Sequence, residues 1–148
     1  MSLDLSAPVR AAIVAASAIT STLPAYLGSY PVFTRVPVPD DAPYPMVVVA
    51  AQFPGGDEDG VSDQRPIIVR DVMVYGTNGR AATSDQYRAV ETIAHALREL
   101  FHRQRGAITV AGWSVTEIVA ATPQPAPVDD EQTVGRRVEV TVRLARTS

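Results

Sequence analysis

A strand–loop–strand–helix unit between Pro43 and Gly106 constrains the fold of this chain more than any other part of its sequence. The segment Met46–Gln52, with its continuous β-branched residues, is typical of a strand that is covered on both sides. The run Ile67–Tyr75 alternates with the two-residue period of a second strand, and Gly76–Gly79 is expected to close it. An amphipathic helix follows. The unit therefore predicts a compact α+β platform.

The second strand carries one charged residue on its apolar face. Ile68, Val72 and Val74 point to the same side as Arg70. Arg70 is therefore expected either near the edge of the sheet or paired. The loop between the two strands, Phe53–Arg65, is too long for a tight hairpin turn.

The helix of this unit is the longest element that the sequence predicts. Its apolar side chains recur at three- and four-residue spacing and form one stripe: Tyr87, Val90, Ile93, Ala94, Leu97, Leu100 and Phe101. Thr83 and Gln86 have the spacing of a capping box that would begin the helix. Gly106 is expected to end it. At 1.5 Å per residue such a helix would be roughly 30 Å long, enough to cross a four-stranded sheet.

The N-terminal part of the chain predicts a second helix and a short strand. Ser6 is expected to cap a helix whose apolar stripe is Val9, Ala12, Ile13, Ala16 and Ile19. A short strand is expected over Val32–Val36. The prolines of Pro37–Pro45 break regular structure, so this segment is expected to be an extended connector.

The C-terminal part predicts a hairpin and a final strand. The runs Ala107–Val110 and Trp113–Ala121 flank Ala111 and Gly112, which would form the turn. The last strand, Arg137–Leu144, alternates, so its valines and Leu144 are expected to face the core. The sequence as a whole predicts one α+β domain over residues 1–148. Its mostly antiparallel sheet would have about four to five strands, with two α-helices packed on one face.

Composition supports one globular domain and excludes several classes of function. The 148 residues are 46% hydrophobic and 20% charged, and they include no cysteine, which excludes disulfides, thiol nucleophiles and thiolate metal sites. All 13 basic residues are arginine, and the net charge of −3 gives no electrostatic signature of nucleic-acid binding. The most apolar early run, Ala11–Ile19, falls well short of the ~20 residues of a membrane span. It is expected to be a helix of the mature protein.

No residue pattern predicts a reaction centre. His95 and His102, the only histidines, are seven residues apart on the long helix, whereas helical metal ligands are usually four apart; both are expected on its solvated face. Gly112-Trp113-Ser114 lacks the second glycine of a nucleophile elbow. No catalytic residue, cofactor or metal ligand is therefore assigned, and the chain is not expected to be an enzyme.

Two acidic loops, rich in proline and glycine, are the candidate contact surfaces instead. The loop at 53–65 carries Asp57, Glu58, Asp59 and Asp63, and the loop at 122–132 carries Asp129, Asp130 and Glu131. The first loop lacks the ligand spacing of an EF-hand and is flanked by strands, and whether it binds a cation stays open. Long loops on a rigid sheet are typical of proteins that contact neighbours.

The order of these elements resembles a known family. The segment Ala42–Val49, reading APYPMVVV, together with the strand Val69–Gly76, the helix Ala82–Phe101 and the final strand Arg136–Val142, is similar to the tail terminator (tail completion, head–tail joining) proteins of long-tailed phages and gene transfer agents. The resemblance covers nearly the whole chain. It rests on size, element order and hydrophobic pattern, and the acidic segment Asp57–Asp63 matches no family pattern.

The resemblance implies a structural virion protein. Such proteins form a ring, commonly a hexamer, that caps the tail tube, ends its polymerisation and joins the tail to the connector of the head. The implied partners are other copies of this chain, the tail tube protein and the head-completion or connector protein, and DNA would pass through the lumen without sequence-specific binding. The implied location is the head-proximal end of the tail in a virion made in the bacterial cytoplasm, without a membrane.

Within such a ring the acidic loops would face the axis, the tube or the connector. Arg136, Arg137 and Arg143 would then pair with acidic loops of the neighbouring copy. One alternative to this contact stays open: the loops are merely solvated and the ring forms through sheet edges. Two other functions also stay open. The chain would be a small non-catalytic binding or adhesion module that uses the loops at 53–65 and 122–132, or a small enzyme whose site residues are scattered along the sequence.

Overall fold

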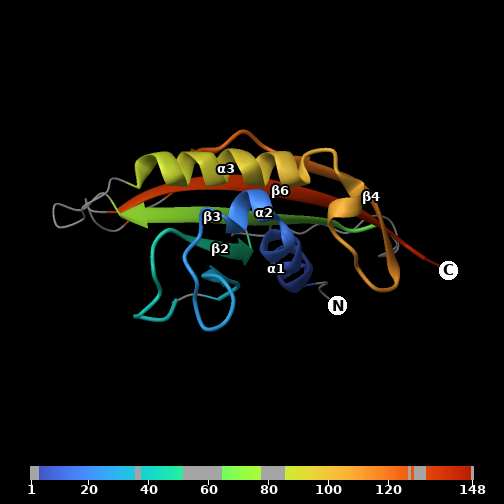
Figure 1. Cartoon of the computed structure of the whole chain (residues 1–148). Helices are drawn as coiled ribbons and strands as arrows, with labels where there is room; N and C mark the ends of the chain where they lie inside the picture. Colours follow the sequence, from blue (N-terminus) through green and yellow to red (C-terminus); the bar gives the residue numbers. More distant parts are fainter. Residues whose placement is uncertain are drawn as a thin grey trace.

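The computed structural model describes residues 4–35, 38–51, 65–77, 86–126, 128 and 133–147, and within these ranges the chain forms one mixed sheet with helices on one face (Figure 1). The strands are β1 (Val32–Phe33), β2 (Met46–Ala51), β3 (Ile67–Thr77), β4 (Trp113–Ala120), β5 (Gln124–Pro125) and β6 (Thr133–Arg146). Their order is β1-β2-β3-β6-β4, with β5 paired to β6. The strands pair antiparallel except for β1 and β2, which are parallel. The predicted α+β class is confirmed.

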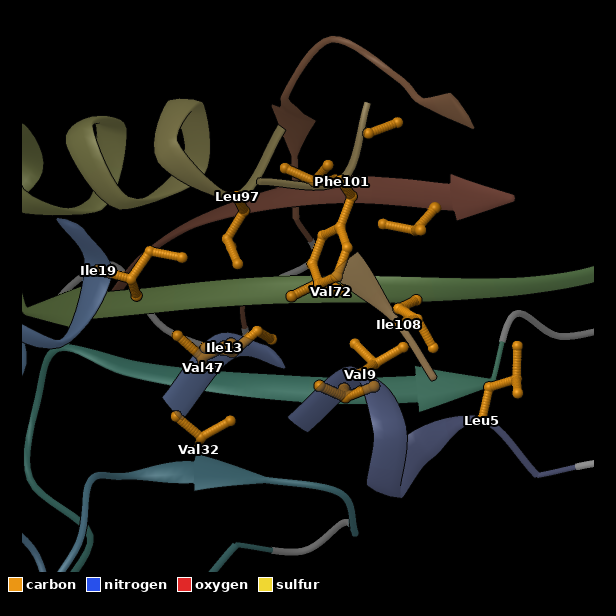
Figure 2. Close-up of a cluster of buried hydrophobic side chains, with 14 of the residues drawn as sticks. Leu5, Val9, Ile13, Ile19, Val32, Val47, Val72, Leu97, Phe101 and Ile108 are labelled. Carbon is orange, nitrogen blue, oxygen red and sulfur yellow. The ribbon is translucent and has the colours of Figure 1, made fainter. Parts of the chain in front are cut away.

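The sheet owes its two different faces to alternation along the strands. On β6, Val138, Val140, Val142 and Leu144 are buried, as predicted, and they share one face with the alternate residues of β2 and β3. These side chains form one core cluster with residues of both long helices (Figure 2). The helices are α1 (Ser6–Ala15) and α3 (Tyr87–Phe101), with the short α2 (Ser17–Thr20) between α1 and β1. Two helices therefore cover one face.

The main helix is shorter than predicted and lies along the strands. Its 15 residues span only about 22 Å at 1.5 Å per residue. Figure 1 shows α3 lying along β6 and β3 rather than across the sheet. It begins beside the end of β3, where the backbone N–H of Gln86 donates to Thr77 O at 3.2 Å, and it ends beside β4. The predicted apolar stripe is nevertheless buried at Val90, Ile93, Ala94, Leu97 and Phe101.

The predicted stop at Gly106 is wrong, and the helix begins later than the predicted capping box implies. The N-cap position is Gln86, and Thr83 of the predicted capping box lies outside the described residues. The Gln86 side chain instead joins two other segments, because its Oε1 accepts from Thr77 N at 2.9 Å and its Nε2 donates to Tyr44 O at 3.2 Å. At the C-terminus the helix stops at Phe101, and Gly106 lies in a separate 3₁₀ turn, η2 (Arg105–Ala107). The residue with left-handed backbone conformation after the helix is Arg103, with a φ of 61°.

Three smaller predictions are corrected as well. The first helix is interrupted at Ala16, whose ψ of 106° is extended, so Ile19 reaches the core from the separate α2. Residues 107–110 form no strand, because Val110 makes only an isolated bridge to Trp113 around Gly112. The final strand starts at Thr133 rather than Arg137.

Leu5, not the predicted Ser6, is the N-cap residue of α1, and the Asp4 side chain before it satisfies the first helical N–H. Asp4 Oδ1 accepts the backbone N–H of Ser6 at 2.8 Å, and this bond, with a further contribution from Arg70, lowers the pKa of the Asp4 carboxyl. A lowered carboxyl pKa stabilises the fold above the ordinary value, near 4, and this stabilisation is lost as pH falls through the folded-state pKa.

We expect Asp4→Ala to lower the free energy of unfolding at pH 7 by about 0.5 kcal/mol, the lower end for loss of a cap, since the site is exposed. The difference from the wild type should shrink below about pH 4. Urea denaturation at pH 7 and pH 3 measures it, with the exposed Asp40→Ala as the matched control. A loss that is the same at both pH values would contradict the capping role.

Candidate functional site

The three arginines predicted to pair with a neighbouring copy each lie beside a carboxylate of their own chain. Arg136 is on the helix-covered face, where its Nε contacts Glu91 Oε1 of α3 and its Nη2 donates to Tyr87 Oη at 3.1 Å. The hydrogen bond with Glu91 raises the pKa of the Arg136 guanidinium. This pair ties the first turns of α3 to the start of β6.

Arg137 and Arg143 lie on the opposite face of the sheet. Arg137 Nη1 is 3.8 Å from Asp71 Oδ2 on β3, and Arg143 Nε donates to Glu117 Oε1 on β4 at 3.1 Å. Burial raises the pKa of the Asp71 carboxyl, opposed by the charge of Arg137 and reinforced by Glu139, its cross-strand neighbour. The structure therefore separates Arg136 from the other two arginines by the thickness of the sheet. The predicted acidic partners, Asp57, Glu58, Asp59, Asp63, Asp129, Asp130 and Glu131, lie outside the described residues.

The turn that follows α3 covers the C-terminal part of the outer edge of β4. The backbone N–H of Arg103 donates to Ile118 O at 2.8 Å, and Ala120 N donates to His102 Nδ1 at 3.1 Å. His102 was expected on the solvated face of the helix, but it is a half-buried structural residue that accepts a backbone hydrogen bond. His95 does lie at the surface, with 64% of its side chain exposed. Covered edge groups cannot template pairing with another chain.

The opposite edge, β1, is covered in the same way. Val32 O accepts from Arg10 Nε of α1 at 2.8 Å, and Val32 N donates to Tyr30 O at 2.8 Å. At both ends of the sheet the chain thus occupies outward-facing backbone groups with its own donors and acceptors. These contacts disfavour a ring built by pairing β1 or β4 of neighbouring copies.

A surface hollow of about 470 Å³ opens beside β1. We call it the aromatic hollow, and its lining includes Arg10, Tyr26, Tyr30, Phe33, Arg35 and Pro39. The rings of Tyr26 and Phe33 meet edge to face with centroids 5.6 Å apart. Tyr26 Oη donates to Asp41 Oδ1 at 2.9 Å. This hydrogen bond holds the tyrosine ring in place and raises the pKa of the Tyr26 hydroxyl group. The hollow therefore combines apolar walls with two guanidinium groups.

Leu27 projects at the rim of this hollow. Tyr26 and Ser29 exchange two backbone hydrogen bonds of 2.9 Å, so Leu27 and Gly28 are the two central residues of a tight turn. Both have positive φ, 47° and 76°, as a type I′ turn requires. Leucine in the left-handed region costs about 1–2 kcal/mol, and its side chain is also 85% exposed. Local strain and exposure of an apolar side chain coincide at this one position.

The fold resembles that of a protein from a virus-like particle. One similar solved structure is a chain described as "Virion of native gene transfer agent (GTA) particle". The superposition has a TM-score of 0.65 and covers 97% of this chain and 95% of that chain, with 13% sequence identity. No protein-family model matches this sequence, and no curated protein does. The likeness is therefore one of fold.

The described residues contain no cluster of three or more histidine or acidic side chains arranged to hold a metal ion. Within the same ranges, the helices are too short or too polar for a membrane span. Most residues that line the aromatic hollow lie within 26–35, from the turn before β1 to the residues just after it, and Arg10 of α1 and Pro39 complete it. Sequence reasoning missed the hollow because the packing of α1 against β1 brings Arg10 to this stretch. The one available signal was Leu27 beside Gly28, an apolar residue at a turn position that usually takes glycine, asparagine or aspartate.

Proposed function

We propose that this chain is a structural virion protein that caps the tail tube, ends its polymerisation and joins the tail to the head connector as an oligomeric ring, with no enzymatic role. The observation that carries the proposal is the fold likeness to a chain of a gene transfer agent virion over 97% of this sequence. The family resemblance of the sequence, from APYPMVVV at Ala42–Val49 to the final strand, supports the same role independently.

The contacts between copies would use surfaces other than the edge strands. A closed ring needs two different patches on each copy that meet head to tail. The covered edge of β1 and the partly covered edge of β4 favour loops and exposed side chains for these patches over edge pairing. The acidic loops at 53–65 and 122–132 therefore stay the candidate contacts with neighbouring copies, the tail tube protein and the connector protein.

The charge of the assembled ring suits a passage for DNA. Six copies, each with a formal net charge of −3, would carry −18 together. A negatively charged lumen repels the phosphate backbone, so DNA would pass without being retained. The virion location at the head-proximal end of the tail follows from this role.

Electron microscopy of the purified full-length chain, together with its mass in solution, tests the proposal. We expect closed rings, sixfold in projection, and tail tubes that stop growing when the ring protein is added to assembling tube protein. A chain that stays monomeric at assembly concentrations and leaves tube length unchanged would contradict the proposal. That result would favour a small binding or adhesion module.

A further inference from the structure

We propose that the aromatic hollow receives the acidic segment Asp57–Asp63 of a neighbouring copy, with Leu27 as an apolar anchor in the same contact. The inference rests on the proposed ring and names the two surfaces that would meet in it. The hollow and the acidic segment are different parts of the chain, so their contact is head to tail, the kind that can close into a ring.

Charge complementarity favours this occupant, because Asp41, the carboxylate of this chain beside the hollow, already accepts from the Tyr26 hydroxyl group. The described residues that line the hollow include Arg10 and Arg35 but no acidic side chain. Within seven residues the acidic segment carries Asp57, Glu58, Asp59 and Asp63 and no basic residue. Guanidinium groups bind carboxylates through charge-assisted hydrogen bonds, and aromatic walls exclude water from such pairs. The acidic segment is flanked by Phe53 and contains Val61, which supply apolar groups for the walls.

Leu27 supports an interface at this place independently of charge. A leucine that is 85% exposed and held at a φ of 47° gains nothing from its own fold, since neither burial nor a relaxed backbone favours it. A strained backbone conformation at an exposed apolar side chain points to a function for that position, and burial by a partner is the function that would favour leucine there. Leu27 stands at the rim of the hollow and lines it, so one partner would cover both.

Disulfide cross-linking tests the contact, because the chain has no cysteine of its own. Two nearly isosteric variants are made separately: Ser29→Cys in the lining of the hollow and Ser62→Cys in the acidic segment. When the two proteins are mixed under mild oxidation, we expect a disulfide-linked heterodimer as the main product. In the matched control, Ser114→Cys replaces Ser29→Cys. Ser114 is an exposed residue of β4, and this variant should give little heterodimer.

Charge reversal adds a second readout. Arg35→Glu should reduce the cross-linked fraction and the ring population at least tenfold, and adding Asp59→Arg should restore much of both. If rings form but no disulfide joins positions 29 and 62, this contact is overturned while the proposal of a ring still stands. A double variant that closes the disulfide within a single monomer would overturn the contact between copies. Absence of both rings and heterodimer would overturn both proposals.

Discussion

Replacing Phe101 by alanine is expected to lower the free energy of unfolding by about 3–5 kcal/mol, the range for deleting a fully buried phenylalanine side chain. Phe101 is the last residue of α3 and is 0% exposed. Figure 2 shows its ring among Leu97, Val72 and Ile108, which come from α3, β3 and the segment before β4. Truncation would leave a cavity where three elements meet, and packed cores collapse only partly around such cavities.

Tyr87→Ala is the matched control for this substitution. Tyr87 is the first aromatic residue of the same helical stripe, but it is 46% exposed and contacts Arg136 through its hydroxyl group. Its loss should lower the free energy of unfolding by about 1 kcal/mol or less. Urea denaturation followed by circular dichroism measures both variants. Equal losses at the two positions would contradict the packing described for the end of α3.

The contrast between Phe101 and Tyr87 shows how far the sequence predicts this fold. Helical and strand periodicity identified the core residues of α3 and β6, because a buried face imposes its period on the sequence. The same periodicity could not say where the stripe leaves the core. That point depends on the position of β3 and β6 beneath the helix, and these strands come from distant parts of the chain.

Element boundaries were predicted less well because long-range contacts set them. Glycine is a residue type that often ends helices, which is why Gly106 was expected to end α3. The helix ends earlier, where His102 and Arg103 form hydrogen bonds with β4. Arg70 was expected near an edge or paired. It lies on the central strand β3, 5% exposed, opposite the last residue of β2, and its Nη1 donates to Val69 O at 2.8 Å. Neither arrangement has a local signal in the sequence.

The pairing of Arg136, Arg137 and Arg143 with acidic loops of a neighbouring copy stays a prediction. Strand alternation sends Arg136 to one face of the sheet and the other two arginines to the opposite face. The aromatic hollow was not predicted, since it depends on the packing of α1 against β1. Residue types that suit an interface can be read from a sequence, whereas the surface that they share requires the fold.

Gly76→Ala is expected to lower the free energy of unfolding by about 1–3 kcal/mol, the usual range for overpacking a core. Gly76 was expected to begin a turn, but it is a buried residue of β3 beneath the start of α3. A Cβ atom there would lie 2.6 Å from Val90 Cγ2 and 3.1 Å from Gln86 Cβ. The helix would have to move away from the strand, which would strain the Gln86–Thr77 and Arg136–Glu91 contacts. Gly106→Ala is the matched control, because its added Cβ would meet nothing within 4 Å.

A double-mutant cycle with Val90→Ala shows whether this close approach is the cause. Val90→Ala alone removes buried methyl groups and should itself lower the free energy of unfolding by about 1–2 kcal/mol. It also removes the atom that the Gly76→Ala methyl group would strike. The loss in the double variant should therefore be smaller than the sum of the two single losses by about 1 kcal/mol or more. Strictly additive losses would show that glycine is needed at position 76 for the backbone conformation of β3 and not for the packing of α3 against the sheet. A double-variant loss smaller than the sum would instead show that the contact between Gly76 and Val90 sets the distance between the helix and the sheet.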